Sequence, residues 1–226
     1  MTSADFETPT PTPAVPLVEV AIGTDITIRF EAKRCIHARF CVLQAPMVFL
    51  ANVAGEWIFR DNLDADHLVA VAENCPSGAI TYSRHDGRKG ETAPPVNLAV
   101  VRENGPYAIR AKVRADKPEG ADRMTLCRCG ASKNKPFCDG SHKEAGFLDS
   151  GEPMGRVSEP LTNRNGEIDV TPVTDGPLVI TGPLEICSGT GRTIDRTTSV
   201  ALCRCGGSSS KPYCDGTHAR IGFIAP

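Results

Sequence analysis

The sequence predicts an α+β fold in which a mixed N-terminal unit is followed by two β-rich units of similar sequence. Two observations support this prediction. Strand-like and helix-like patterns alternate over the first third of the chain. A cysteine-rich pattern then fills residues 127–142 and returns at residues 203–218. Such recurrence marks one structural unit used twice, and two units are too few for a solenoid, so we expect a two-lobed body with pseudo-two-fold symmetry.

The N-terminal unit is expected to have the element order βαββαβ. Alternating apolar residues predict strands and helical spacing predicts helices, giving a strand at 26–30, a helix at 35–44, strands at 48–50 and 56–59, a helix at 63–74 and a strand at 79–83. Turn-forming residues then mark a linker. The expected division is a flexible Thr- and Pro-rich tail at 1–19, the mixed domain at 20–86, the linker at 87–95, the first repeat at 96–150 and the second repeat at 151–226.

The repeated pattern consists of residue types that bind metal ions. It reads CRCGASKNKPFCDGSH and then CRCGGSSSKPYCDGTH. In an extended chain, residues i and i+2 point to the same side, so the first two cysteines of each copy can reach one metal ion. A helix that opens at the third cysteine would place the histidine, four residues later, on the same face. The candidate ligands are Cys127, Cys129, Cys138 and His142 in the first copy and Cys203, Cys205, Cys214 and His218 in the second.

Both copies closely resemble the signature C-R-C-G-x-S-x-x-x-P-x-C-D-G-[ST]-H of the CDGSH, or NEET-type, iron–sulfur family. The match includes Ser132 and Ser208, and Thr217 replaces the usual serine in the second copy. The resemblance implies one 2Fe–2S cluster in each repeat, bound by three cysteines and one histidine. It also implies that a chain with two motifs imitates the homodimer of one-motif members, so we expect a monomer with an internal pseudo-dimer.

The histidine ligand predicts the properties of each cluster. Replacing a thiolate by a neutral imidazole favours the reduced state. Protonation of the imidazole links reduction to pH and predicts that the cluster is lost in acid. A cluster with these properties suits either proton-coupled electron transfer or release to another protein.

A third set of cysteines lies in the N-terminal unit. Cys35, Cys41 and Cys75 with the proline that follows it resemble the C-x2-C-x2-C and Cys-Pro elements of bacterial ferredoxins, with Ala38 at the middle position. The segment therefore resembles a divergent single-cluster ferredoxin domain. Three thiolates suit a 3Fe–4S cluster, whereas a 4Fe–4S cluster needs a further ligand, and His37 lies one place from the missing position. A ferredoxin fold without a cluster is the remaining alternative.

Zinc sites and disulfides are alternative explanations of the cysteines. Three cysteines and one histidine also form structural zinc sites, although these more often use Cys–x–x–Cys arms. Nine of the ten cysteines fall into the three sets, and no signal peptide directs the chain out of a reducing compartment, so we expect free thiols and a cytoplasmic protein. The remaining positions of note are interpreted as a buried thiol at Cys187, a core residue at Trp57, and solvated or partner-docking side chains at Lys133, Lys135 and Lys211.

Electron transfer is the function that these features favour. We expect electrons to pass between the N-terminal cluster, the two 2Fe–2S clusters and a redox partner protein. The alternatives are donation of a cluster or iron to an apo iron–sulfur acceptor, and sensing of redox state or acid. The sequence contains no nucleotide-binding loop or nucleophile–base pair, so we expect an electron carrier rather than an enzyme. The net charge of −2 gives no sign of nucleic-acid binding, and no apolar run is long enough for a membrane span.

Overall fold

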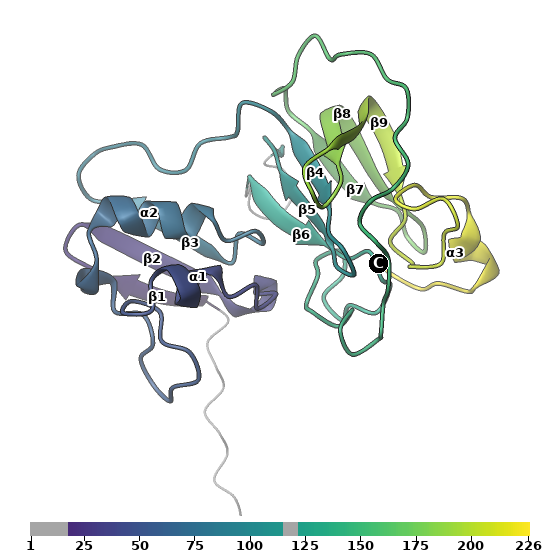
Figure 1. Cartoon of the computed structure of the whole chain (residues 1–226). Coiled ribbons are helices and arrows are strands. Elements are labelled where there is room, and N and C mark those ends of the chain that lie inside the picture. The colour runs from purple at the N-terminus through teal and green to yellow at the C-terminus, as the bar shows by residue number, and fades with distance from the viewer. Residues whose placement is uncertain (1–17, 115–121) are drawn as a thin grey trace, which may run out of the picture.

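Strands and short helices make up an N-terminal domain and a larger sheet to which both repeats contribute (Figure 1). This computed structural model describes residues 18–114 and 122–226. The predicted α+β class is confirmed. Most of the predicted tail at 1–19 lies outside the described residues. Within the described part of the chain, no helix has the length and apolar character needed to cross a membrane.

The N-terminal domain is a three-stranded antiparallel sheet with two short α-helices packed against it. Helix α2 begins where the Asp64 carboxylate accepts a hydrogen bond from the amide of His67, which is a typical N-cap. The strands are β1 (Val18–Ile22), β2 (Ile26–Glu31) and β3 (Ile80–Arg84), in the order β1-β2-β3. Between β2 and β3 lie η1 (Ala32–Arg34), α1 (Phe40–Gln44), η2 (Arg60–Asn62) and α2 (Ala65–Glu73).

This order differs from the expected βαββαβ pattern in three places. Strand β1 precedes the expected first strand. The expected helix at 35–44 begins only at Phe40, because His37 and Arg39 adopt left-handed backbone conformations, with φ of 53° and 65°, that an α-helix excludes. The two expected central strands are reduced to a single bridge between Phe49 and Ile58, since the residues between them form bends and turns.

The two repeats form one six-stranded sheet. The first repeat contributes β4 (Leu98–Val101), β5 (Tyr107–Arg110) and β6 (Arg123–Leu126), and the second contributes β7 (Asp169–Pro172), β8 (Leu178–Cys187) and β9 (Thr193–Leu202). The pairs within each repeat are antiparallel. Strands β4 and β8 run parallel and join the repeats, with Leu98 opposite Glu185. A short helix, α3 (Thr217–Arg220), lies within the second cysteine pattern and just beyond it.

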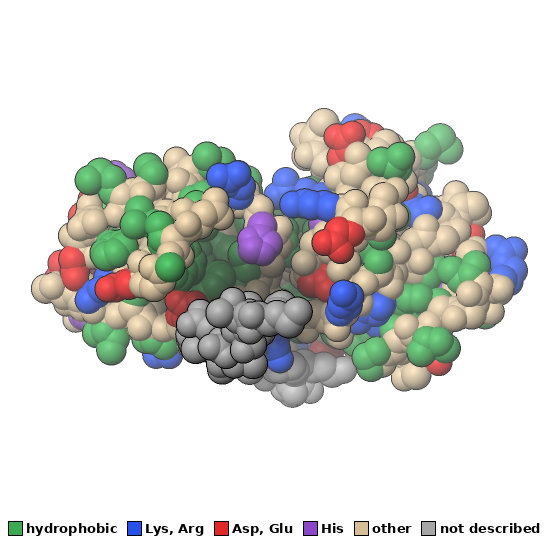
Figure 2. Space-filling model, turned by 90° about the horizontal axis from the view of Figure 1, so that it is seen from below, with side chains coloured by type: hydrophobic (Ala, Val, Ile, Leu, Met, Phe, Trp, Pro, Cys, Tyr) green, Lys and Arg blue, Asp and Glu red, His purple; other side chains and the backbone are tan. Residues whose placement is uncertain are grey.

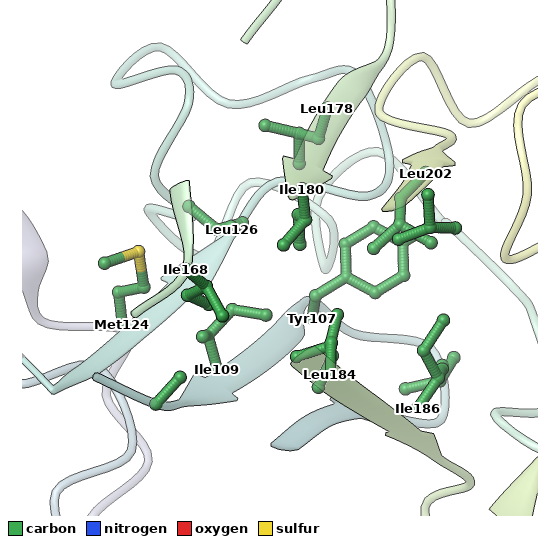
Figure 3. Packing of buried hydrophobic residues seen from close by; sticks show 14 of the residues in the cluster. Tyr107, Ile109, Met124, Leu126, Ile168, Leu178, Ile180, Leu184, Ile186 and Leu202 are labelled. Carbon is green, nitrogen blue, oxygen red and sulfur yellow. The ribbon is translucent and has the colours of Figure 1, made fainter. Parts of the chain in front are cut away.

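Both repeats also contribute to one hydrophobic core. In Figure 3 the side chains of Tyr107 and Ile109 on β5 lie near those of Leu178 and Ile180 on β8 and Leu202 on β9. Each of these side chains is fully or almost fully buried. Burying an apolar side chain of this size contributes roughly 1.5–3 kcal/mol to stability. Separation of the repeats would therefore expose a shared core, whereas the N-terminal domain has a core of its own.

The hydroxyl of Tyr107 extends this link to the second cysteine pattern. It lies 2.8 Å from the carbonyl oxygen of Cys203 and 2.9 Å from that of Pro212, so its proton is shared between them. Burial raises the pKa of Tyr107 well above its ordinary value, and the hydroxyl therefore remains a donor. A side chain of the first repeat thus positions the first cysteine of the second.

Candidate metal centres

The first two cysteines of each repeat lie side by side, as their spacing predicts. Cys127 and Cys129 have their sulfur atoms 3.8 Å apart, and those of Cys203 and Cys205 are 3.6 Å apart. These distances are far longer than a disulfide bond of about 2.0 Å, and all ten cysteines are free thiols. Two sulfur atoms at this separation can bind one iron from the same side.

Backbone hydrogen bonds bring the third cysteine back beside the first pair. The amide of Cys127 donates to the carbonyl of Pro136 at 2.8 Å, and the amide of Cys138 donates to the carbonyl of Thr125 at 2.9 Å. The loop between the cysteines therefore folds back onto the end of β6. The second repeat contains the same two bonds, from Cys203 to Pro212 at 2.8 Å and from Cys214 to Ala201 at 2.9 Å.

The predicted helix at the third cysteine is wrong, although the first cysteine–histidine pair still forms. Cys138 precedes a series of turns at 141–146, and in the second repeat helix α3 begins only after Cys214. The reason is a glycine in a left-handed conformation two residues after each cysteine, with φ of 90° at Gly140 and 80° at Gly216. Nevertheless, the Nδ1 atom of His142 lies 3.4 Å from the sulfur of Cys138.

The histidine of the second repeat is oriented differently. The Nδ1 atom of His218 lies 2.8 Å from the carbonyl oxygen of Asp175. Among the described residues no comparable contact joins His218 to Cys214. The structure thus brings together three cysteines in each repeat by backbone pairing, but it pairs the histidine with its cysteine only in the first.

The three thiols of the first repeat differ in pKa because their burial and hydrogen bonds differ. A hydrogen bond from Cys127 lowers the pKa of Cys129 to about 6, and the amide of Ala131 also donates to its sulfur at 3.4 Å. The same thiol pair raises the pKa of Cys127. Burial raises the pKa of Cys138 to about 11 and lowers that of His142. Binding of a metal by these thiols therefore requires the release of protons.

The three N-terminal cysteines line one cavity of about 480 Å³. Cys35, Cys41 and Cys75 all border it, and burial together with the charge of Cys75 raises the pKa of both other thiols. Hydrophobic side chains line the hollow in this lobe (Figure 2). His37 also lies on the cavity wall but is largely exposed to solvent. Trp57 borders the cavity too; it is half-buried and packs against the edge of the core, with its ring edge-on to Phe30 at 4.8 Å.

The arrangement of these donors fits iron–sulfur clusters. The cysteine sets point to iron–sulfur chemistry, and in the first repeat the sulfur atoms of Cys127 and Cys129 lie 3.8 Å apart. The donors of the first repeat form two pairs, Cys127 with Cys129 and Cys138 with His142, whereas among the described residues the second repeat has only the Cys203–Cys205 pair. In addition, the buried Nη1 atom of Arg204 has no hydrogen-bond partner in the described structure, and this guanidinium interacts electrostatically with Cys127. A buried cationic donor near these thiols fits an anionic group such as a cluster.

Sequence reasoning missed two arginines that shape the cysteine loops. Arg128 and Arg204 follow the first cysteine of each pattern, and both are fully buried. The Nε atom of Arg128 donates to the carbonyl of Gly105 at 2.8 Å, and that of Arg204 donates to Gly176 at the same distance. Each guanidinium therefore ties its loop to the Gly-Pro turn of its own repeat. Both arginines occupy the second position of the repeated CRCG sequence, and this recurrence is the sequence signal that could have identified them.

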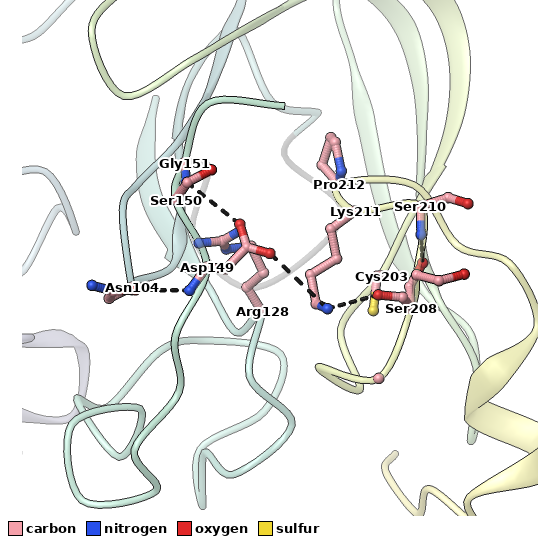
Figure 4. Close-up of polar contacts among 12 residues, drawn as sticks. Asn104, Arg128, Asp149, Ser150, Gly151, Cys203, Ser208, Ser210, Lys211 and Pro212 are labelled. Atoms are coloured by element: carbon pink, nitrogen blue, oxygen red, sulfur yellow. Dashed lines mark hydrogen bonds and ion pairs between the residues drawn. The ribbon is translucent and has the colours of Figure 1, made fainter. Parts of the chain in front are cut away.

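Two lysines expected in solvated loops make specific contacts instead. Lys135 donates to the carbonyl of Ser132 at 2.7 Å, and Lys211 donates to that of Ser208 at 2.6 Å. In Figure 4, Asp149 lies between Arg128 of its own repeat and Lys211 of the other, whose ammonium is 4.0 Å from the carboxylate. These lysines close the cysteine loops, and Lys211 also reaches across to the first repeat.

The two cysteine loops contact each other through their backbones. Cys129 and Cys205 form an antiparallel bridge, and the residue after each is a glycine with φ of 82° or 79°. A Cβ atom on Gly130 would lie 2.6 Å from the carbonyl oxygen of Cys205, and one on Gly206 would lie 2.6 Å from that of Cys129. Only glycine permits this reciprocal approach, which holds the second cysteines of the two repeats side by side.

Substitution of Gly206 tests this contact. Gly206→Ala and Gly216→Ala both place an alanine at φ near +80°, but only the first forces a Cβ against a carbonyl, since nothing lies within 4 Å of the Cβ position at Gly216. We expect Gly206→Ala to lower the free energy of unfolding by roughly 1–3 kcal/mol more than Gly216→Ala. Denaturation in urea measures both. Equal losses would show that the loops do not approach as described.

Comparisons with known proteins agree with this geometry. A family model described as "Iron-binding zinc finger CDGSH type" matches residues 104–143 and 175–219, and a model described as "Divergent 4Fe-4S mono-cluster" matches residues 22–85. "CDGSH iron-sulfur domain-containing protein 1" of Rattus norvegicus is 34% identical over 65 residues, which are 29% of this chain and 56% of that protein. The protein of the same name from Mus musculus gives the same values.

A third relative is "CDGSH iron-sulfur domain-containing protein 2 homolog" of Drosophila ananassae, 48% identical over 42 residues, or 19% of this chain and 31% of that protein. The chain thus spans about half the length, or less, of the curated relatives it matches. The two CDGSH matches contain both cysteine patterns, and the mono-cluster match contains all three N-terminal cysteines. The chain therefore contains two segments of the CDGSH iron–sulfur type and a divergent 4Fe-4S mono-cluster segment.

Proposed function

We propose that this protein is a one-electron carrier with three iron–sulfur sites. The observation that carries the proposal is the direct contact of the cysteine loops, in which Cys129 and Cys205 bridge the two repeats. Close spacing of separate redox sites serves the movement of electrons, whereas a donor of single clusters needs each site to open independently. A bound 2Fe–2S cluster would supply a one-electron couple at each repeat.

The proposed ligands follow the donor pairs of the first repeat and the corresponding positions of the second. In each repeat the first two cysteines would hold one iron of a bound cluster, and the third cysteine and the histidine would hold the other. Burial of Cys127 and Cys203, each 1% exposed, keeps water from that side of each site. The half-exposed His142 and His218 lie on the outer side. The ligands are Cys127, Cys129, Cys138 and His142 for the first 2Fe–2S cluster and Cys203, Cys205, Cys214 and His218 for the second.

Reciprocal contacts support a pseudo-two-fold relation between the repeats. The Gly130–Cys205 and Gly206–Cys129 contacts exchange under such a rotation. The same rotation exchanges the parallel pairing of β4 and the end of β8 with the parallel bridge between Val113 and Ile168. A shared core and a shared sheet within one chain favour a monomer that contains an internal pseudo-dimer. Its partner would be a redox protein, and its ten free thiols suit a reducing compartment such as the cytoplasm.

The N-terminal site is proposed to bind a cluster through Cys35, Cys41 and Cys75. Three thiols around one cavity suit a 3Fe–4S cluster, and a 4Fe–4S cluster would take its fourth ligand from solvent or from His37 on the cavity wall.

A second candidate function is the donation of a cluster or iron, or the sensing of redox state or acid. The observation in its favour is the exposure of the cysteine–histidine side. Cys214 is half-buried while Cys203 is fully buried, and His218 already bonds to a backbone carbonyl. Release of a cluster would begin at this outer arm.

Redox cycling separates the two functions. An electron carrier is expected to keep a constant iron content per chain when it is reduced with dithionite and reoxidised repeatedly. Transfer of iron to an apo-ferredoxin, measured in parallel by its visible spectrum, is expected to be slow. Transfer that is complete within the same period would support donation and contradict the carrier.

Exchange of the histidines tests the ligand assignment. His142→Cys and His218→Cys each replace a neutral ligand by an anionic one, so each is expected to lower the reduction potential of one cluster, on the order of 100 mV. Potentiometric titration of each variant measures the change, and His67→Cys on exposed α2 serves as the control. An unchanged potential in both variants would show that the imidazoles are not ligands.

Electron paramagnetic resonance tests the N-terminal assignment. Oxidised protein is expected to give a 3Fe–4S signal that disappears in Cys75→Ala, because two thiolates cannot hold such a cluster. Cys187→Ala, at a buried cysteine outside the three sets, is expected to keep the signal. The iron content per chain is measured with each spectrum. An oxidised protein without the signal but with the iron of a larger cluster would identify 4Fe–4S instead.

A further inference from the structure

The N-terminal domain meets the first repeat through residues that adjoin cysteines on both sides. Arg34 precedes Cys35, and its guanidinium lies 5.4 Å from the ring centroid of Phe137, which precedes Cys138. The same guanidinium donates to the carbonyl of Arg123 at 2.9 Å. Arg34 is 6% exposed, so this cation–π contact is buried.

Arg123 makes the return contact from the first repeat. It is 2% exposed, and its guanidinium donates to the carbonyl of Ala72 at 2.6 Å, to that of Cys75, and to that of Ile80 at 3.1 Å. An ion pair with Glu91 compensates its charge. Arg123 is the first residue of β6, and this strand ends at Leu126, directly before Cys127. Arg123 therefore contacts the carbonyl of Cys75 from the strand that leads into the first cysteine pattern.

Two further contacts show that the fit is close. A Cβ atom on Gly78, three residues after Cys75, would lie 2.5 Å from the carbonyl oxygen of Arg123. Gly78 has φ of 65°, so its conformation and its surroundings both require glycine. On the other side of the junction, the side-chain amide of Asn134 donates to the carbonyl of Lys33 at 2.7 Å. These contacts therefore hold the N-terminal cysteines and the cysteine loop of the first repeat in one relative position, in addition to the linker that joins the two domains.

The corresponding face of the second repeat is covered by another part of the chain. Tyr213 occupies the position of Phe137, and the guanidinium of Arg156 lies 3.3 Å from its ring centroid. The amide of Arg156 donates to the carbonyl of Ile194 at 2.7 Å, which fixes this segment on β9. The hydroxyl of Tyr213 donates to Asp195 at 2.8 Å. Each aromatic residue thus has one arginine partner, and only that of the first repeat belongs to the N-terminal domain.

We propose that the first repeat is the relay between the N-terminal site and the second repeat, and that Arg34 and Arg123 are the residues that position this relay. This inference rests on the proposed electron-carrier function. One electron from a one-electron donor protein reduces the N-terminal site. That site is reoxidised as the first repeat is reduced across the Arg34–Phe137 contact, and the first repeat is reoxidised as the second is reduced across the Cys129–Cys205 bridge. No covalent bond forms or breaks. Figure 1 shows the same spatial order, with β4 to β6 between the N-terminal domain and α3.

Magnetic interaction between the sites tests the order. Matched variants, Cys138→Ala and Cys214→Ala, each remove a ligand from one repeat. In protein partly reduced with dithionite, the N-terminal signal is expected to lose its enhanced spin relaxation in Cys138→Ala and to retain it in Cys214→Ala. A loss that is equal in both variants, or greater in Cys214→Ala, would overturn the relay. Absence of any N-terminal signal from the unmodified protein would instead contradict the proposed function on which the relay rests.

Hydrogen exchange tests the positioning residues without reference to electron transfer. Arg34→Gln removes the contact at the junction, and Arg156→Gln removes its counterpart on the second repeat. Loss of a hydrogen bond from a charged donor changes an opening equilibrium by about tenfold or more. We expect at least that increase in exchange for the amides of Ala79 and Ile80 in Arg34→Gln, and no increase there in Arg156→Gln.

Should Arg34→Gln fail to fold, Asn134→Ala removes only the Lys33 contact and is expected to give a smaller increase at the same amides. Unchanged exchange in the folded variant would overturn the assignment.

Discussion

The backbone contact between the two cysteine loops is the constraint on which the arrangement of the repeats depends. Gly130 and Gly206 each bring a carbonyl of the other repeat to a position that a side chain would occupy. No side chain can therefore separate Cys129 from Cys205. The parallel pairing of β4 with β8 and the hydroxyl of Tyr107 both act across the same boundary, and each is compatible with only one placement of the repeats.

Buried arginines hold the irregular cysteine loops in place by donating hydrogen bonds to backbone carbonyls. Arg128 and Arg204 are 1% exposed or less and hold the cysteine loops against the Gly-Pro turns through the carbonyls of Gly105 and Gly176. Arg123 is 2% exposed and donates to the carbonyls of Ala72 and Cys75 near the end of α2. Arg128 and Arg123 also have carboxylate partners, whereas Arg204 has a buried nitrogen with no hydrogen-bond partner in the described structure. The Nη2 atom of Arg204 donates instead to the backbone oxygens of Val173 and Pro226, and its guanidinium interacts electrostatically with Asp175 and with Cys127 of the first repeat.

Local geometry was predictable from the sequence, and contacts between distant segments were not. The spacing of Cys127 and Cys129 predicts neighbouring sulfur atoms, because alternation along an extended chain is a local property. The helix expected at Cys138 failed because Gly140 adopts a left-handed conformation that spacing alone does not reveal. Nothing near Arg34 in the sequence points to Phe137, since the two residues are brought together only by the packing of separate domains.

The path of strand β8 has a consequence for how the protein is made. Its last residues, up to Cys187, pair with β4 of the first repeat, and the Tyr107 hydroxyl takes its acceptors from Cys203 and Pro212. When synthesis has just passed the first cysteine pattern, neither β8 nor the carbonyls of Cys203 and Pro212 have yet been made. The N-terminal domain can fold during synthesis around its own core, but the first repeat lacks its partners until the second cysteine pattern has been made. Both CDGSH segments are therefore completed together, only once the second cysteine pattern has been made, and a nascent chain stalled before Cys203 would expose thiols without a finished site.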